Sequence, residues 1–109
     1  MKKTIDLSII TVSYNTKQLL DSCLASIYDS LRLSKLAFEV IVVDNASTDG
    51  SGELIGKKYP QVMLIKNRLN FGFGKANNQA VAKAQGKTLL FLNSDTKVLN
   101  RAIETLYRF

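Results

Sequence analysis

The sequence predicts an α/β fold in which a mostly parallel sheet is flanked by helices. Short, β-branched apolar runs alternate along the chain with stretches whose apolar residues recur at helical spacing. The runs are almost wholly apolar, as strands covered on both faces must be. The order strand–helix occurs four times, which is typical of parallel strands joined by right-handed crossovers.

The first half of the chain is predicted to form two strand–helix pairs. The first strand is Leu7–Val12. Its helix carries apolar residues three or four positions apart, at Leu19, Leu20, Cys23, Leu24, Ile27 and Leu31. Asn15 or Thr16 is placed to cap that helix. The second strand is Val40–Val43, and the shorter helix Ser51–Lys58 follows it.

We expect Asp49 and Ser51 mainly to cap the second helix, and Pro60 to end it. The third strand, Val62–Ile65, precedes a helix over Gly74–Ala84 that Gly86 is expected to end. The fourth strand is Leu89–Leu92. A last helix over Asn100–Phe109 presents Ala102, Ile103 and Leu106 on one side.

Length and composition bound the function. A chain of 109 residues, 46% hydrophobic and 22% charged, fits one globular domain spanning 1–109 and does not fit a disordered chain. No run is long enough to span a membrane. With no histidine and a single cysteine, Ser-His-Asp triads, zinc fingers and internal disulfides are excluded. The charge of +6 favours anionic partners, but the lysines are too scattered to indicate a nucleic-acid tail.

Three predicted strand ends carry polar clusters that turns and helix caps also favour. They are Ser13–Asn15, Asp44–Gly50 and Asn93–Thr96. Because ligands of parallel sheets bind at the carboxyl ends of the strands, a site is expected there. Phosphate motifs fail: Gly86-Lys87-Thr88 lacks the earlier glycine of a P-loop, and Gly72-Phe73-Gly74 lacks the third glycine of a dinucleotide fingerprint.

Four ordered motifs resemble the donor-binding half of family 2 glycosyltransferases. They are SIITVSYN ending at Asn15, VIVVDNASTDG ending at Gly50, NFGFGKANN ending at Asn78 and LFLNSD ending at Asp95. The resemblance covers nearly the whole chain. It implies a Rossmann-like GT-A fold, a nucleotide-sugar donor, a divalent metal, inversion at the anomeric carbon and a role in cell-surface polysaccharide biosynthesis. The glycine-rich third motif resembles that of rhamnosyltransferase-like members.

The first two motifs imply the contacts to the base. Val12 and Tyr14 resemble the residues that hold the base in this family, and an aromatic ring there can stack on a pyrimidine. Asp44 resembles the acidic residue that accepts a hydrogen bond from the base, and Asn45 beside it belongs to the same donor-binding set. A carboxylate accepts but does not donate, which suits the N3 hydrogen of uracil or thymine. UDP- or dTDP-sugars are therefore the expected donors.

The other two motifs imply the contacts to the diphosphate. In Asn93-Ser94-Asp95, which occupies the place of the family's Asp-any-Asp signature, Asp95 resembles the ligand of Mg²⁺ or Mn²⁺. The first signature position is Asn93, which removes one charge. In the third motif Gly72 and Gly74 permit close approach of backbone to ligand, Lys75 can meet the diphosphate, and Asn77 and Asn78 resemble the family's polar pair.

The family's catalytic base is a carboxylate in the acceptor half, and Asp95 is followed by only 14 residues. The base, and the site for a saccharide or lipid-linked acceptor, are expected beyond Phe109, so that the chain alone transfers no sugar. A sheet that stops after its fourth strand is expected to expose an edge and to self-associate. No nucleic-acid partner is expected.

The lone cysteine and the lack of a signal-peptide core after Met1-Lys2-Lys3 favour a cytoplasmic protein, at the inner face of the membrane in its full-length form. Two alternatives remain open at this point. One is a noncatalytic nucleotide-binding or regulatory module, and the other is a nucleotidyltransferase on a similar sheet.

Overall fold

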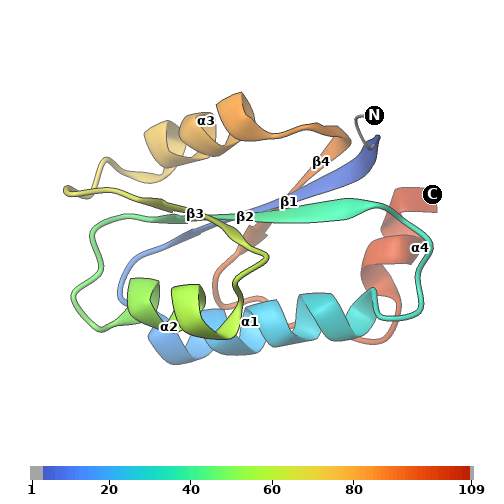
Figure 1. Ribbon diagram of the computed structural model, residues 1–109, viewed down its shortest axis with the longest axis horizontal. Coiled ribbons are helices and arrows are strands. Elements are labelled where there is room, and N and C mark those ends of the chain that lie inside the picture. The colour runs from blue at the N-terminus through green and yellow to red at the C-terminus, as the bar shows by residue number, and fades with distance from the viewer. Residues whose placement is uncertain (1–3, 109) are drawn as a thin grey trace.

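The computed structural model describes residues 4–108, in which strands and helices alternate strictly (Figure 1). Met1–Lys3 and the expected end of the last helix at Phe109 lie outside the described residues. In chain order the elements are β1 (Ile5–Ser13), α1 (Lys17–Ser30), β2 (Phe38–Asp44), α2 (Ser51–Lys58), β3 (Met63–Lys66), α3 (Phe73–Lys83), β4 (Gly86–Asn93) and α4 (Ala102–Arg108).

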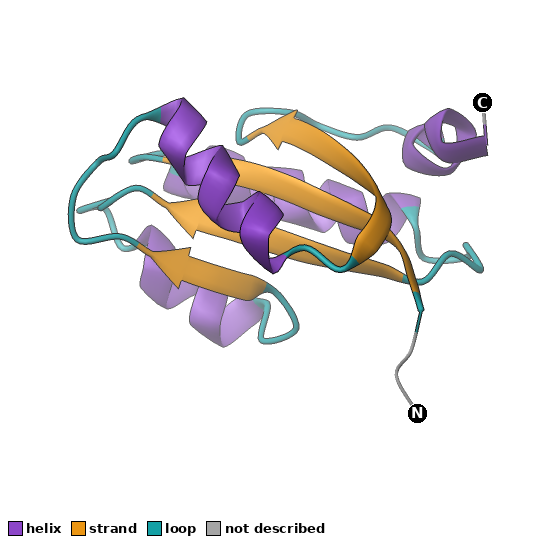
Figure 2. Cartoon of the chain, turned by 90° about the horizontal axis from the view of Figure 1, so that it is seen from above, coloured by secondary structure: helices purple, strands orange, loops and turns teal. Residues whose placement is uncertain are grey.

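All four strands are parallel and lie in the order β3-β2-β1-β4. Strand β1 is therefore interior and pairs with β2 on one side and β4 on the other. Helices α1, α2 and α4 pack on one face of the sheet, while α3 lies across the other face (Figure 2). The predicted α/β class with a parallel, helix-flanked sheet is confirmed.

The two interior strands are buried on both faces because their side chains alternate between two cores. Leu7, Ile9, Val40 and Val42 face the core beneath α1, α2 and α4. Ile10, Val12, Ile41 and Val43 face α3. This double coverage explains why β1 and β2 carry almost wholly apolar runs, with Ser8 and Thr11 of β1 buried, instead of the polar–apolar alternation of a half-exposed strand.

The two edge strands differ from the prediction that all four strands are covered on both faces. In β4, Leu90 and Leu92 pack against the larger core, but Leu89 is 37% exposed and Phe91 is 50% exposed. Met63 of β3 is likewise 37% exposed. The reason is that α3 contacts β1 and β2 through small alanines and leaves the same face of β4 open.

Gly86 does not end α3, as the sequence predicts, but is the first residue of β4. The helix ends earlier, where Ala84 turns to extended backbone. A Cβ on Gly86 would come within 2.5 Å of the Ser8 backbone nitrogen. Glycine is therefore needed for the close approach of β4 to β1 and serves strand pairing, not helix capping.

The helix bounds otherwise agree with the prediction, with two differences in detail. Helix α2 covers the predicted residues, and α4 begins two residues later than expected. Thr16 occupies the N-cap position of α1, but its own side chain makes no capping hydrogen bond. Instead the backbone nitrogen of Lys17 donates to Oδ2 of Asp49 at 2.9 Å, so the carboxylate expected to cap α2 also serves α1.

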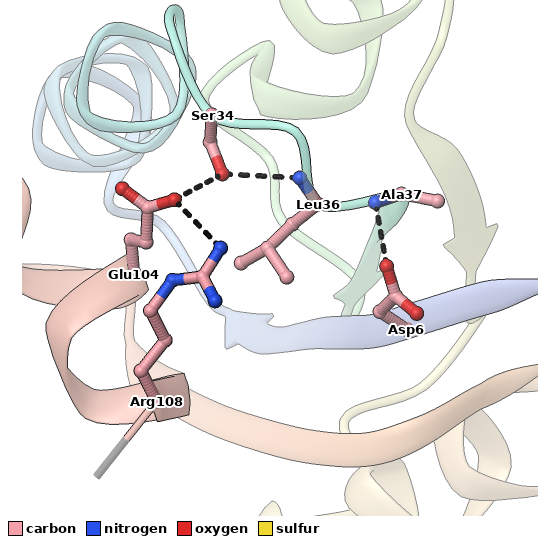
Figure 3. A network of polar contacts seen from close by, with 6 residues as sticks. All are labelled: Asp6, Ser34, Leu36, Ala37, Glu104 and Arg108. Atoms are coloured by element: carbon pink, nitrogen blue, oxygen red, sulfur yellow. Dashed lines mark hydrogen bonds and ion pairs between the residues drawn. The ribbon is translucent and has the colours of Figure 1, made fainter.

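Polar contacts attach α4 to the loop between α1 and β2 (Figure 3). Oε1 of Glu104 accepts from Ser34 Oγ at 3.1 Å and from Arg108 Nη2 at 3.4 Å. The same loop is held to β1 where Ala37 N donates to Asp6 Oδ2 at 2.9 Å. In the described part of the chain no helix has the length and apolarity needed to cross a membrane.

Candidate functional site at the carboxyl edge of the sheet

The parallel register brings the polar strand ends to one edge of the sheet. Asp44 pairs with Ser13 on one side and with Lys66 on the other, and Asn93 pairs with Val12. Strand β1 therefore separates β2, with Asp44, from β4, with Asn93. Two strand spacings make this separation about 10 Å. The loops that follow β1, β2 and β3 lie together beyond this edge, at the left of Figure 1.

The loops after β1 and β2 are bonded to each other. Asn15 N donates to Ser47 Oγ at 2.9 Å, and Thr48 N donates to Asn15 Oδ1 at 2.7 Å. Asn45 N donates to the Ser13 carbonyl at 2.8 Å. Asn15 and Ala46 have φ of 51° and 70°, a left-handed conformation that is uncommon outside glycine and favours Asn among the rest. These hydrogen bonds fix the loop after β1 against the loop after β2.

The two residues expected to hold the base lie in contrasting environments. The side chain of Val12 is 6% exposed and packs in the core under α3, so its side chain contributes packing. Tyr14 is 50% exposed, directly beyond the end of β1. A large aromatic ring left in water at a strand end is available for stacking.

Asp44 is the buried carboxylate of the site, with 4% of the residue exposed. Its Oδ1 accepts from Ser47 N at 3.2 Å, and its carbonyl accepts from Asn67 N at 2.9 Å. A buried carboxylate is costly unless hydrogen bonds compensate it. One backbone donor compensates the carboxylate only in part, which favours a further donor from a ligand.

Asn45 is 2% exposed, and its amide is engaged by the loop that leads into α3. Its Nδ2 donates to the Gly72 carbonyl at 3.1 Å. Its Oδ1 accepts from Asn67 Nδ2 at 3.0 Å and from Phe71 N at 3.3 Å. The side chain that the sequence assigns to donor binding thus bonds to the protein.

The start of α3 carries the expected glycines and lysine in an exposed segment. Gly72 has φ of 81°, which side-chain-bearing residues rarely adopt, while Gly74 has open space around it. Lys75 is exposed, with its Nζ 4.8 Å from the ring centroid of Phe71. No carboxylate pairs with this ammonium within the described residues. Asn77 is half-buried and Asn78 exposed.

The turn after β4 is anchored to β1 by hydroxyl groups. Ser13 Oγ and Thr16 Oγ1 lie 3.0 Å apart, and Thr16 Oγ1 donates to Ser94 Oγ at 3.1 Å. The chain turns where Thr96 N donates to the Asn93 carbonyl at 3.0 Å. The Ser94 side chain thus holds the turn after β4 to Thr16, while Asn93 and Asp95 are exposed.

The oxygen groups at this edge fit a divalent ion only when a bound ligand supplies further oxygen atoms. Across residues 4–108, no three acidic, histidine or cysteine side chains come together as a protein-made metal site. The exposed groups on the β4 turn are the Asp95 carboxylate and the Asn93 amide, both oxygen donors. Mg²⁺ keeps several waters and takes one or two carboxylates plus substrate phosphates, which matches this sparse set.

Cys23 packs beside this turn but is no nucleophile. Its thiol is buried and donates to the Asn93 carbonyl at an S–O distance of 3.8 Å. Burial, with the nearby charge of Asp95, raises the pKa of Cys23 to about 11. The thiol therefore stays protonated at neutral pH.

Sequence reasoning missed two amides at this edge, Asn67 and Gln79. Asn67 follows β3 directly, so the rule that polar residues after strand ends build the site applies to it as well.

An open cavity of about 410 Å³ beside the edge is lined by Asn15, Thr16, Lys17, Gln18, Leu19 and Asp49. None of the predicted donor ligands lines it.

A model of the family described as "Glycosyl transferase family 2" matches residues 8–109. The chain is 34% identical over 107 residues to the poly(ribitol-phosphate) beta-glucosyltransferase of Bacillus spizizenii, an alignment covering 94% of this chain and 17% of that protein.

Solved structures show the same arrangement of elements. TarS of S. aureus, residues 1–349 in complex with UDP, matches with a TM-score of 0.82 and 28% identity over 95% of this chain and 31% of that one. A mannosyltransferase from Pyrobaculum calidifontis, in complex with GDP-Man and Mn²⁺, matches with a TM-score of 0.79 and 27% identity over 93% and 30%. The chain thus spans less than a third of each of these proteins.

Proposed function

Since the chain belongs to glycosyl transferase family 2 and has the GT-A fold of its structural relatives, we propose that it forms the donor-binding part of a glycosyltransferase that uses a UDP- or dTDP-sugar. The observation that carries this proposal is the order of the strands. Asp44 and the turn bearing Asp95 flank the interior strand β1 at the same edge. A nucleoside diphosphate laid across that edge meets one carboxylate at its base and the other at its diphosphate.

The base end is read by Asp44, with Tyr14 stacking on the ring. The carboxylate of Asp44 accepts the N3–H of uracil or thymine while Ser47 N holds its other oxygen. Guanine also carries an N–H on its pairing edge, and one relative binds GDP-Man. We therefore assign the preference for a pyrimidine to the ring of Tyr14 and the Asp44 carboxylate together.

The diphosphate end is held by Asp95 and Lys75. Asp95, with Asn93 beside it, would hold Mg²⁺ or Mn²⁺, which supplies positive charge to the nucleoside diphosphate as it leaves. The ammonium of Lys75 adds a second positive charge near the start of α3. Stabilising the charge that develops on the leaving group is how such a site lowers the barrier most.

The reaction is a displacement at the anomeric carbon by an acceptor hydroxyl, with inversion. The C–O bond to the diphosphate breaks as the bond to the acceptor oxygen forms, and a base takes the hydroxyl proton. We place that base, and the binding site for a saccharide or lipid-linked acceptor, in the larger part of the relatives that this chain does not match. The chain alone is then expected to bind the donor without transferring sugar.

Titration of the chain with UDP, dTDP, GDP and NAD, each with and without Mn²⁺, tests the proposal. Calorimetry should show UDP or dTDP binding that strengthens when Mn²⁺ is present. Binding of NAD without metal would instead support a dinucleotide-binding module. Affinity that falls steeply with salt and ignores the nucleotide would indicate a nucleic-acid binder.

The open face of β4 leads us to propose that the isolated chain self-associates. Phe91 and Leu89 are exposed there, next to the unpaired edge of the sheet. Light scattering should show a mass that rises with concentration, and Phe91→Lys should restore a monomer. Leu33→Lys, at a residue 69% exposed in the loop after α1, is the matched control that should change nothing. A wild-type chain that stays monomeric at high concentration and binds no hydrophobic dye contradicts this proposal.

A further inference from the structure

The loop before α3 is held by a chain of three side-chain amides. Asn67 and Gln79 bond to each other twice: Asn67 Nδ2 donates to Gln79 Oε1 at 2.8 Å, and Gln79 Nε2 donates to Asn67 Oδ1 at 2.9 Å. Asn67 Nδ2 also donates to Asn45 Oδ1 at 3.0 Å. The amide chain therefore connects the end of β2, the end of β3 and the second turn of α3.

At one end of this chain of amides, the Asn45 side chain bonds to the backbone of the segment before α3. The Oδ1 of Asn45 accepts from Phe71 N, and its Nδ2 donates to the Gly72 carbonyl. Both polar side-chain atoms of Asn45 therefore bond to two adjacent residues. With 2% of Asn45 exposed, little of its side chain is left for a donor molecule to touch. Asn67 N also donates to the Asp44 carbonyl at 2.9 Å, which ties the loop to the residue that reads the base.

Helix α3 contacts the sheet through small side chains, although it covers Ile10, Val12, Ile41 and Val43. Its buried residues are Ala76 and Ala80, which carry one methyl group each. The adjoining segment 68–75 is exposed, and Gly72 adds backbone freedom. The amide hydrogen bonds therefore add a second attachment, which ties the segment before α3 to the end of β2.

We propose that Asn45, through Asn67 and Gln79, is a positioning residue that sets the Phe71–Lys75 segment against the diphosphate end of the donor site. The inference rests on the proposed function, because Lys75 matters only if a diphosphate binds there. It reassigns Asn45 from a donor ligand to a residue that acts through the loop. It also gives Gln79, which lies outside the predicted donor-binding set, a role in affinity.

The test compares Asn45→Ala, Gln79→Ala and the control Gln85→Ala, which removes an exposed amide in the loop between α3 and β4. Calorimetry measures the affinity of each for UDP and for uridine, which lacks the diphosphate. Loss of a hydrogen bond costs about 0.5–1.5 kcal/mol, so Asn45→Ala and Gln79→Ala should each weaken the affinity for UDP about two- to tenfold. The affinity of both variants for uridine should stay at the wild-type value. The control Gln85→Ala should bind UDP and uridine as the wild type does.

Hydrogen exchange gives a readout that needs no ligand. In Gln79→Ala the amides of residues 67–75 should exchange faster than in the wild-type chain, whereas those of β1 should not. Faster exchange everywhere would mean general destabilisation and would overturn the positioning role. An equal loss of uridine and UDP affinity in Asn45→Ala, with Gln79→Ala unchanged, would mean direct contact and would overturn it too. A wild-type chain that binds neither ligand refutes the proposed function instead, while exchange still tests the amide chain.

Discussion

Replacing Asp95 with alanine is expected to abolish the gain in UDP affinity that Mn²⁺ provides. Asp95 is the exposed carboxylate on the turn after β4, and the described residues offer no cluster of three ligands to compensate for its loss. Removing a residue that merely supports a metal ligand typically costs 10–100-fold, so losing the ligand Asp95 should lower the UDP affinity with Mn²⁺ by at least roughly tenfold. Without metal, the variant and the wild type should bind UDP equally, as measured by calorimetry.

Two further variants sharpen this expectation. Asp95→Asn keeps an oxygen donor and removes the charge, so it should retain an intermediate metal dependence. Asp29→Ala removes an exposed carboxylate near the far end of α1 and should leave metal dependence intact. An equal loss of affinity with and without Mn²⁺ in Asp95→Ala would mean that this carboxylate does not act through a metal.

Replacing Asp44 with asparagine is expected to reverse the preference between uracil and cytosine. The carboxylate can accept the N3–H of uracil but faces a lone pair on N3 of cytosine. An amide of the same shape can donate to that lone pair and can still accept from Ser47 N. Since a hydrogen bond to a charged group contributes about 1.5–3 kcal/mol, the ratio of UDP to CDP affinity should fall by roughly 10–100-fold.

Calorimetric titration of both nucleotides with wild type and Asp44→Asn measures that ratio. Glu53→Gln removes the same charge from exposed α2 and is the control for a general electrostatic effect. It should leave the ratio unchanged. If Asp44→Asn keeps the wild-type ratio, the base is read elsewhere and the buried carboxylate serves only the loop through Ser47.

The interior of the fold and the edge that holds the site could be predicted because they depend on local patterns. Almost wholly apolar runs identify β1 and β2, and parallel strands collect their ends at one edge. The open face of β4 could not be predicted in this way. Whether Phe91 is covered depends on where α3 crosses the sheet, which no run of residues encodes.

The structural environments of Gly86 and Asn45 have a common physical origin. Gly86 is typical of a helix end by local propensity, but the nearby Ser8 backbone requires a glycine there. Asn45 has the chemistry of a ligand contact, but Phe71 and Gly72 use both of its polar atoms. In each case the deciding neighbour lies more than 25 residues away in sequence, beyond the reach of local rules.

The interior place of β1 has a consequence for folding. Strand β1 is completed on one side by β4, since Ile5 pairs with Gly86. Pairings between such distant segments form slowly, because a long stretch of chain must first be ordered. A nascent chain therefore carries an unpaired edge of β1 until β4 emerges, and during that interval the edge is a site that a chaperone can bind.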